Sequence, residues 1–180
     1  MQIKFILATL FISIVIASLA IYTSFLPKLV PTEVKIKVVQ SPINIKNYLN
    51  NVENWGQWIV GAVEDIDKMH FNRKSLGNGA VLKWWSTKLG DGALELIDIQ
   101  DTCVSYQMIS DNNLFRQKGS IYWGRDSLQN FIVWRDTLDI STNLVGRWTA
   151  GEQFSKSLQK ANFQILEILV QKLSQKPNSN

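Results

Sequence analysis

The feature that most constrains this chain is an uncharged apolar segment near its start. Residues 5–26 (FILATLFISIVIASLAIYTSFL) carry no charged side chain over 22 positions. An α-helix rises about 1.5 Å per residue, so a helix of this length matches the roughly 30 Å hydrocarbon core of a bilayer. Its few serines and threonines form no strong polar face, which argues against a helix buried in a soluble domain. We therefore expect a membrane helix followed by a separately folded domain.

Two interpretations of this segment stay open. A single-pass anchor in the cell membrane is favoured, because apolar residues continue through Tyr22 and Phe25 and aromatic side chains are common at the membrane–water interface. A cleavable secretion signal is the alternative, because Lys4 supplies a basic start and residues 18–20 (Ser-Leu-Ala) have the small-x-small form of a peptidase site. Lysines flank both ends of the segment, so the side of the membrane that holds the domain stays open.

Composition narrows the classes of partner. The chain has 180 residues, of which 46% are hydrophobic and 19% charged, as in a packed globular protein. The net charge of +4 comes from dispersed side chains, and without a basic run to follow a phosphate backbone we expect no nucleic-acid partner. One histidine, His70, and one cysteine, Cys103, predict no metal site, and no motif predicts a cofactor. The oligomeric state is not indicated.

The length that remains after the apolar segment predicts one further domain. About 145 residues are enough for a single core and too few for two. We expect an anchor and short linker over residues 1–31, one domain over 32–176, and a flexible tail over 177–180. Pro27 and Pro31 would make the linker a stiff spacer.

Alternation and capping predict the first elements of the domain. Residues 33–39 (EVKIKVV) alternate charged and apolar side chains, which is typical of a strand with one wet face. Ser41 offers an N-cap side chain and Pro42 suits the first helical position, so a short helix is expected over residues 43–50.

Turn signals then divide the middle of the chain into strands. A second short helix is expected over residues 52–58, where Trp55 and Trp58 share a face and core packing is the favoured interpretation. Glycines at residues 76–79 and 90–92 predict tight turns. The strands expected around and after these turns form an antiparallel meander at residues 80–85, 93–99, 102–109, 114–123 and 130–140.

The last element is a long amphipathic helix over residues 152–173. Apolar side chains recur every three or four positions, which places them on one face of a helix. These residues are Phe154, Leu158, Ala161, Ile165, Leu169 and Leu173. We expect this face to pack on the sheet.

This order of elements resembles the helix-grip fold of the START-like (SRPBCC) superfamily, within it the polyketide cyclase/dehydrase-type branch, over about residues 32–174. Several members of that branch also begin with one membrane helix. The segments that carry the resemblance are EVKIKVV with its capped helix, NVENWGQW, GNGAVLKWW, residues 92–96 (GALEL), residues 131–134 (FIVW) and Gly151 before the last helix.

The resemblance implies an α+β fold in which a curved antiparallel sheet of about six to seven strands wraps around the C-terminal helix. It also implies a cavity between the two that accepts a hydrophobic or amphipathic small molecule. Alternation predicts the lining, although the same residues would equally fill a solid core. The predicted lining residues are Leu94, Leu96, Tyr106, Met108, Ile121, Trp123 and Trp134 of the strands and Phe154, Leu158 and Ile165 of the helix.

The sequence holds no recognisable nucleophile–base pair. Tyr106, Arg135 and Asp136 are the candidates for an inward-facing acid or base. The hypothesis is a membrane-anchored domain that binds a lipid-like small molecule. The alternatives are a cyclase- or dehydratase-type enzyme acting on a hydrophobic carbonyl substrate, and an interaction or scaffold protein with a filled core.

Overall fold

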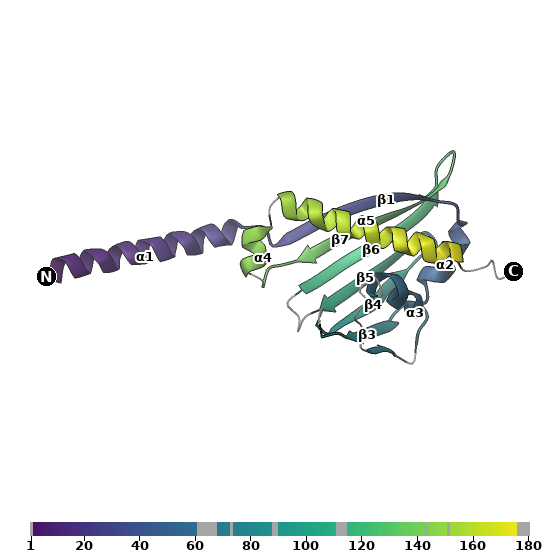
Figure 1. The fold of residues 1–180 in the computed structure, drawn as a ribbon, viewed down its shortest axis with the longest axis horizontal. Coiled ribbons are helices and arrows are strands. Elements are labelled where there is room, and N and C mark those ends of the chain that lie inside the picture. Colours follow the sequence, from purple (N-terminus) through teal and green to yellow (C-terminus); the bar gives the residue numbers. More distant parts are fainter. Residues whose placement is uncertain are drawn as a thin grey trace.

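The domain consists of one sheet gripping one long helix, with a second helix projecting from it (Figure 1). The computed structural model describes residues 2–60, 68–72, 74–87, 90–110, 115–142, 144–150 and 152–175. The helices are α1 (Gln2–Phe25), α2 (Pro42–Leu49), α3 (Val52–Trp55), α4 (Leu144–Thr149) and α5 (Glu152–Gln175), and a π-helical turn, η1 (Gly56–Val60), follows α3.

Seven strands form one antiparallel sheet in the order β1-β7-β6-β5-β4-β3-β2. The strands are β1 (Leu29–Val38), β2 (Lys68–Phe71), β3 (Val81–Trp85), β4 (Gly92–Ile99), β5 (Cys103–Ser110), β6 (Phe115–Arg125) and β7 (Asn130–Asp139). We call the face that carries α5 the inner face and the opposite one the outer face. The α+β class, the meander and the C-terminal helix packed on the sheet are confirmed.

The first strand starts earlier than the sequence predicts. β1 begins at Leu29 and pairs with β7 from its first residue, so most of the stiff spacer expected between Pro27 and Pro31 is strand. Pro31 lies opposite Thr137 within this pairing. Proline lacks the N–H of a ladder, and an edge strand such as β1 tolerates it because only one side of the strand is paired. Alternation did not predict this extension, because Leu29 and Val30 are two successive apolar residues directly before that proline.

The capped helix and the tryptophan pair follow the predictions. The Ser41 side chain accepts a hydrogen bond from the Asn44 N–H, and Pro42 opens α2. Trp55 and Trp58 are fully buried, which confirms core packing for both. The second helix departs from α-helical geometry after Trp55, where η1 begins.

Two short elements were not predicted. β2 pairs with β3 at the edge of the sheet, and α4 precedes α5. Each has four to six residues, too few for a hydrophobic period to show. The expected loop at Glu64, Asp65 and Asp67 and the tail over 177–180 lie outside the described residues.

The face that α5 buries is rotated from the predicted one. Leu169 and Leu173 are buried as expected, but Ala161 is exposed and the neighbouring Asn162 is buried instead. Phe154, Leu158 and Ile165 are half-buried. The prediction assigned only apolar residues to the buried face, so it left out Asn162. This residue lies four positions from both Leu158 and Leu166 and is therefore on the same face of the helix as they are.

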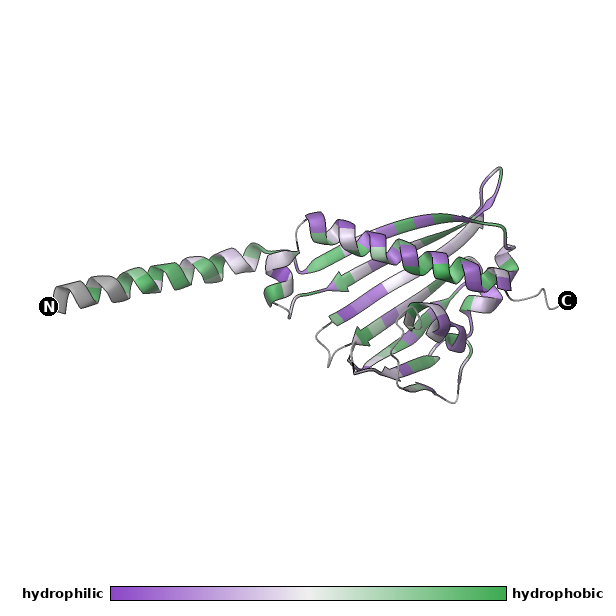
Figure 2. Ribbon diagram, viewed as in Figure 1, coloured by the Kyte–Doolittle hydropathy of each residue, from purple (hydrophilic) through white to green (hydrophobic). Residues whose placement is uncertain are grey.

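The N-terminal helix extends away from the domain and is mainly hydrophobic where Figure 2 colours it. Its large apolar side chains are exposed, among them Phe11, Ile16 and Ile21. In the part of the chain with a described structure, no helix has both the length and the apolarity that a membrane crossing needs. A helix at this place is confirmed, whereas its expected role as a membrane span is not supported by that finding.

Candidate functional site

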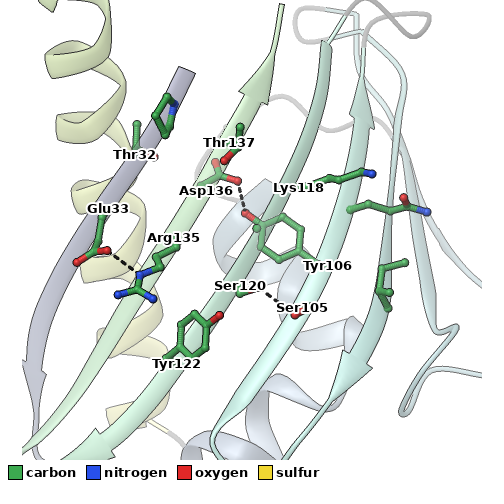
Figure 3. Close-up of a pocket in the computed structure, with 14 residues that line it drawn as sticks. Thr32, Glu33, Ser105, Tyr106, Lys118, Ser120, Tyr122, Arg135, Asp136 and Thr137 are labelled. Carbon is green, nitrogen blue, oxygen red and sulfur yellow. Dashed lines mark hydrogen bonds and ion pairs between the residues drawn. The ribbon is translucent and has the colours of Figure 1, made fainter. Parts of the chain in front are cut away.

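A tyrosine and an aspartate meet on the inner face because a glycine lies between them. Tyr106 of β5 pairs with Gly119 of β6, and Gly119 pairs with Asp136 of β7. A Cβ at Gly119 would lie 2.5 Å from the Tyr106 hydroxyl oxygen. Without that Cβ, the tyrosine ring reaches across β6 and its hydroxyl donates to Asp136 Oδ1 at 3.0 Å (Figure 3).

Further donors complete a buried polar network. Trp134 Nε1 donates to the Tyr106 hydroxyl at 2.8 Å, and Gln117 Nε2 donates to Asp136 Oδ2. From α5, the Asn162 side chain bonds Asp136 and also donates to Thr32 Oγ1 at 2.8 Å. The network therefore joins four strands of the sheet, β1, β5, β6 and β7, to the gripped helix.

Burial changes the acidity of this pair. Only 3% of Asp136 is exposed, and desolvation raises its pKa to about 6, against the opposing effect of the hydrogen bonds from Gln117 and Tyr106. Burial, followed by the charge of Asp136, raises the pKa of Tyr106 well above its ordinary value. Near neutral pH Asp136 can exchange a proton while Tyr106 keeps its own, which is the property expected of a candidate acid or base.

On one side of this network the inner face is solid. Leu94, Leu96, Ile121, Trp123 and Trp134, all predicted lining residues, are at most 2% exposed and belong to the hydrophobic core. The rings of α3 and η1 fill the space above them. The ring centroids lie 5.0 Å apart for Trp55–Trp58, 5.2 Å for Trp55–Tyr106 and 5.8 Å for Trp58–Trp134.

On the other side, toward α4, the described side chains of the inner face are only partly buried. Met108 and Leu138 alternate with Tyr106 and Asp136 along their strands and are half-buried, as is Gln117. Phe154 and Leu158, at the start of α5, are half-buried as well. We call this set, Met108, Gln117, Leu138, Phe154 and Leu158, the open end of the inner face.

Two tryptophan indoles of the inner face have a buried N–H without a partner in the described structure. Among the described residues, neither Trp58 Nε1 nor Trp123 Nε1 has a hydrogen-bond partner, although both atoms are buried. An unsatisfied buried donor costs about 1–3 kcal/mol. Both indoles lie in the filled part of the inner face, where a buried water molecule is the usual partner of such a donor.

Of the three predicted acid–base candidates, the structure brings together two. Tyr106 and Asp136 share the network, whereas Arg135, next to Asp136 in β7, lies on the outer face and pairs with Glu33 at 2.6 Å. Adjacent strand residues point to opposite faces, so Arg135 and Asp136 could not both point inward. The sequence did not point to Gln117, Asn162 or Thr32 as site residues. For Gln117 the one available signal was its position two residues before Gly119, which places both residues on the same face of β6.

The outer face holds a hollow of about 700 Å³ (Figure 3). Ser105, Gly119 and Ser120 line this hollow, and their small size leaves space above the sheet. The two serine hydroxyls lie 2.9 Å apart. The charges of Glu33 and Arg135 on its rim neutralise each other. The other lining residues are Pro31, Thr32, Ile97, Tyr106, Gln107, Lys118, Tyr122, Asp136 and Thr137. The sequence did not indicate this hollow.

Within the described ranges, no group of three or more His, Cys, Asp or Glu side chains is arranged to hold a metal ion. His70 is exposed and lies edge-on to Trp85, with ring centroids 5.1 Å apart. Cys103 is buried, and desolvation raises the pKa of its thiol.

The fold itself is shared with many solved structures. No family model matches the sequence, and no curated protein matches it. Ara h 8.0201 superposes with a TM-score of 0.59 at 10% identity, over 82% of this chain and 99% of that one. The solved structures on which this chain superposes have the Bet v1-like, START-like (SRPBCC) fold. Identities this low establish the fold alone.

Two further structures with this fold are biosynthetic proteins. Norcoclaurine synthase from Thalictrum flavum, in complex with dopamine and hydroxybenzaldehyde, gives a TM-score of 0.60 at 12% identity, over 84% of this chain and 90% of that one. The di-domain ARO/CYC StfQ from the steffimycin biosynthetic pathway gives 0.58 at 12% identity, over 78% of this chain. Only 49% of StfQ is covered, so this chain spans about half of that protein.

Proposed function

We propose that the domain binds an amphipathic small molecule at the open end of the inner face. The observation that carries this proposal is the juxtaposition of half-buried apolar side chains, Phe154 and Leu158 among them, with the buried Asp136–Tyr106 network. Apolar surface supplies affinity and a few convergent polar groups supply orientation, which is the usual composition of a small-molecule site.

The polar end of the guest would meet Asp136. The protonated carboxyl can donate to a carbonyl or ether oxygen, and the ionised one can accept from a hydroxyl or an amine. Because its pKa is about 6, both forms are populated near neutral pH. A norcoclaurine synthase of this fold holds an aromatic amine and an aromatic aldehyde, which supports a guest of this size.

Native mass spectrometry of the full chain in detergent, with and without a total lipid extract, tests this function. We expect a bound apolar molecule, and we expect Leu158→Trp to lose it because the larger ring fills the open end. Ala161→Trp is the matched control, since residue 161 is exposed on the same helix. A chain that never carries or takes up such a molecule, or equal uptake by both variants, would overturn the proposal.

A second candidate function is an enzyme of the cyclase or dehydratase type on a hydrophobic carbonyl substrate. The raised pKa of the buried Asp136 favours it, because a carboxyl that keeps its proton near pH 6 can act as a general acid toward a carbonyl oxygen. Dopamine and hydroxybenzaldehyde are suitable probes. Product formation that is lost in Asp136→Asn, with binding retained, would support this function, and binding without turnover would exclude it for these compounds.

We further propose that α1 attaches the protein to a membrane. The exposed apolar side chains support this, because 68% of Phe11 and 61% of Ile16 would otherwise contact water. Co-flotation with phosphatidylcholine vesicles tests it. We expect Ile16→Arg to weaken flotation, and the matched change Val39→Arg, on the exposed surface of the domain, to leave it unchanged. A mature protein that starts after residue 20 would instead support secretion.

A further inference from the structure

The junction between α1 and α4 is held by an arginine from far along the chain. Arg147 of α4 donates to the backbone carbonyl of Thr23 and, at 3.3 Å, to that of Leu26, at the end of α1. The last carbonyls of a helix have no partner within the helix, so this guanidinium satisfies groups that water would otherwise solvate. It also ties α4 to the end of the apolar helix.

Exposed apolar side chains come from α1, α4 and the first residue of β1 at this junction. Tyr22 and Trp148 are in edge-to-face contact, with ring centroids 5.6 Å apart. Phe25 is 82% exposed, Val145 75%, Leu29 55% and Trp148 50%. We call these five residues, Tyr22, Phe25, Leu29, Val145 and Trp148, the junction patch.

The chemistry of the junction patch is that of a water–lipid boundary. Tryptophan and tyrosine are enriched at membrane interfaces, where an apolar ring and a polar tip are both satisfied. The patch is continuous with the exposed apolar surface of α1, and the exposed Lys28 lies beside it in sequence. Exposed apolar patches flanked by polar groups mark docking sites for proteins or membranes. Continuity with an apolar helix favours a membrane here.

We infer that the junction patch docks on the interface of a phospholipid bilayer and fixes the orientation of the domain. This inference rests on the proposed attachment of α1 to a membrane. The start of α5, with Phe154 and Leu158, follows α4 in the chain, and β7 ends on the same side of the domain as α4 (Figure 1). Docking through the patch turns the open end of the inner face toward the bilayer, so an amphipathic guest would come from the lipid.

Site-directed fluorescence of the full chain in phosphatidylcholine vesicles tests this docking. Bimane is attached to Val145→Cys, to Ile16→Cys as a reporter of α1, and to Leu128→Cys as an exposed control at the β6–β7 turn, each in a Cys103→Ala background. Vesicles of brominated phosphatidylcholine supply the quencher. We expect the loss of fluorescence at residues 16 and 145 to be severalfold larger than at residue 128.

The possible outcomes separate the two proposals. Quenching at residue 16 without quenching at residue 145 overturns the docking and leaves the attachment of α1 intact. No quenching at either residue overturns both. A blue-shifted but unquenched probe at residue 145 means that a protein, such as a second copy of this chain, covers the patch, which also overturns the inference. Arg147→Gln is expected to reduce quenching at residue 145 and to spare residue 16, and unchanged quenching at residue 145 would contradict the role of Arg147.

Discussion

The two ends of the inner face share one sheet and one helix but are packed differently. At one end α3 and η1 bring Trp55 and Trp58 over the sheet, and the side chains of Leu94, Leu96, Ile121 and Trp134 are fully buried there. At the other end α5 lies over the sheet without them, and Phe154 and Leu158 stay half-buried. The comparison shows that the short elements α3 and η1, and not the sheet, decide which end of the inner face is filled by side chains. The polar network at Asp136 lies where the filled end meets the open one.

The largest expected effect tests the filled end. Trp58→Ala removes a fully buried ring that contacts Trp55 and Trp134, and we expect a loss of about 3–5 kcal/mol in the free energy of unfolding. The matched change at the open end, Phe154→Ala, is expected to cost about 1 kcal/mol. Urea denaturation measures both. Equal costs would mean that the two ends are packed alike.

Asp136, which lies between the filled end and the open end, is expected to make the stability of the protein depend on pH. The pKa of Asp136 is about 6 in the folded protein and near 3.8 when unfolded, so the folded state binds the proton more tightly. The contribution of Asp136 to the free energy of unfolding is fully present below about pH 4. It is lost as the pH rises through 6, by about 3 kcal/mol in total.

Asp136→Asn should remove this dependence, because the amide keeps its shape without titrating and the Gln117 amide can turn to accept from it. Urea denaturation of both proteins at several values between pH 4 and 7 measures the difference. If the wild type and the variant keep parallel stability profiles, Asp136 does not carry a raised pKa.

The third prediction concerns the close approach of the Tyr106 side chain to Gly119. Gly119→Ala places a Cβ within 2.5 Å of the Tyr106 hydroxyl, and we expect it to cost about 1–3 kcal/mol and to displace Tyr106 from Asp136. Gly124→Ala is the control in the same strand, where the nearest atom, Phe131 Cζ, is 3.0 Å away. Thermal unfolding ranks the two variants, and a smaller loss for Gly119→Ala would mean that the network does not need the glycine.

The smallest expected effect concerns the outer face. Glu33 and Arg135 form an ion pair of 2.6 Å, but both side chains are more than half exposed. Solvent screens such pairs, so Arg135→Ala should leave stability nearly unchanged and should not change ligand uptake. Loss of uptake in this variant would move the binding site from the inner to the outer face.

Local signals were enough to predict most elements. Alternation and turn signals together identified six of the seven strands, the Ser41-Pro42 pair located α2, and helical spacing located α5. Elements that are too short for a period, β2 and α4, could not be found in this way. α4 is also the element on which the junction patch depends, so that surface was invisible in the sequence.

The sequence by itself determined the order of the longer elements, the resemblance to the START-like fold and the apolar character of α1, because periodicity and capping act between residues close along the chain. Only the tertiary structure decided that Tyr106 reaches Asp136 across Gly119, and that Asn162 rather than Ala161 faces the sheet. Those contacts depend on strand register and on the rotation of α5 against its neighbours. Packing between distant segments sets both, and a shift of one residue in a strand would exchange Asp136 for Arg135.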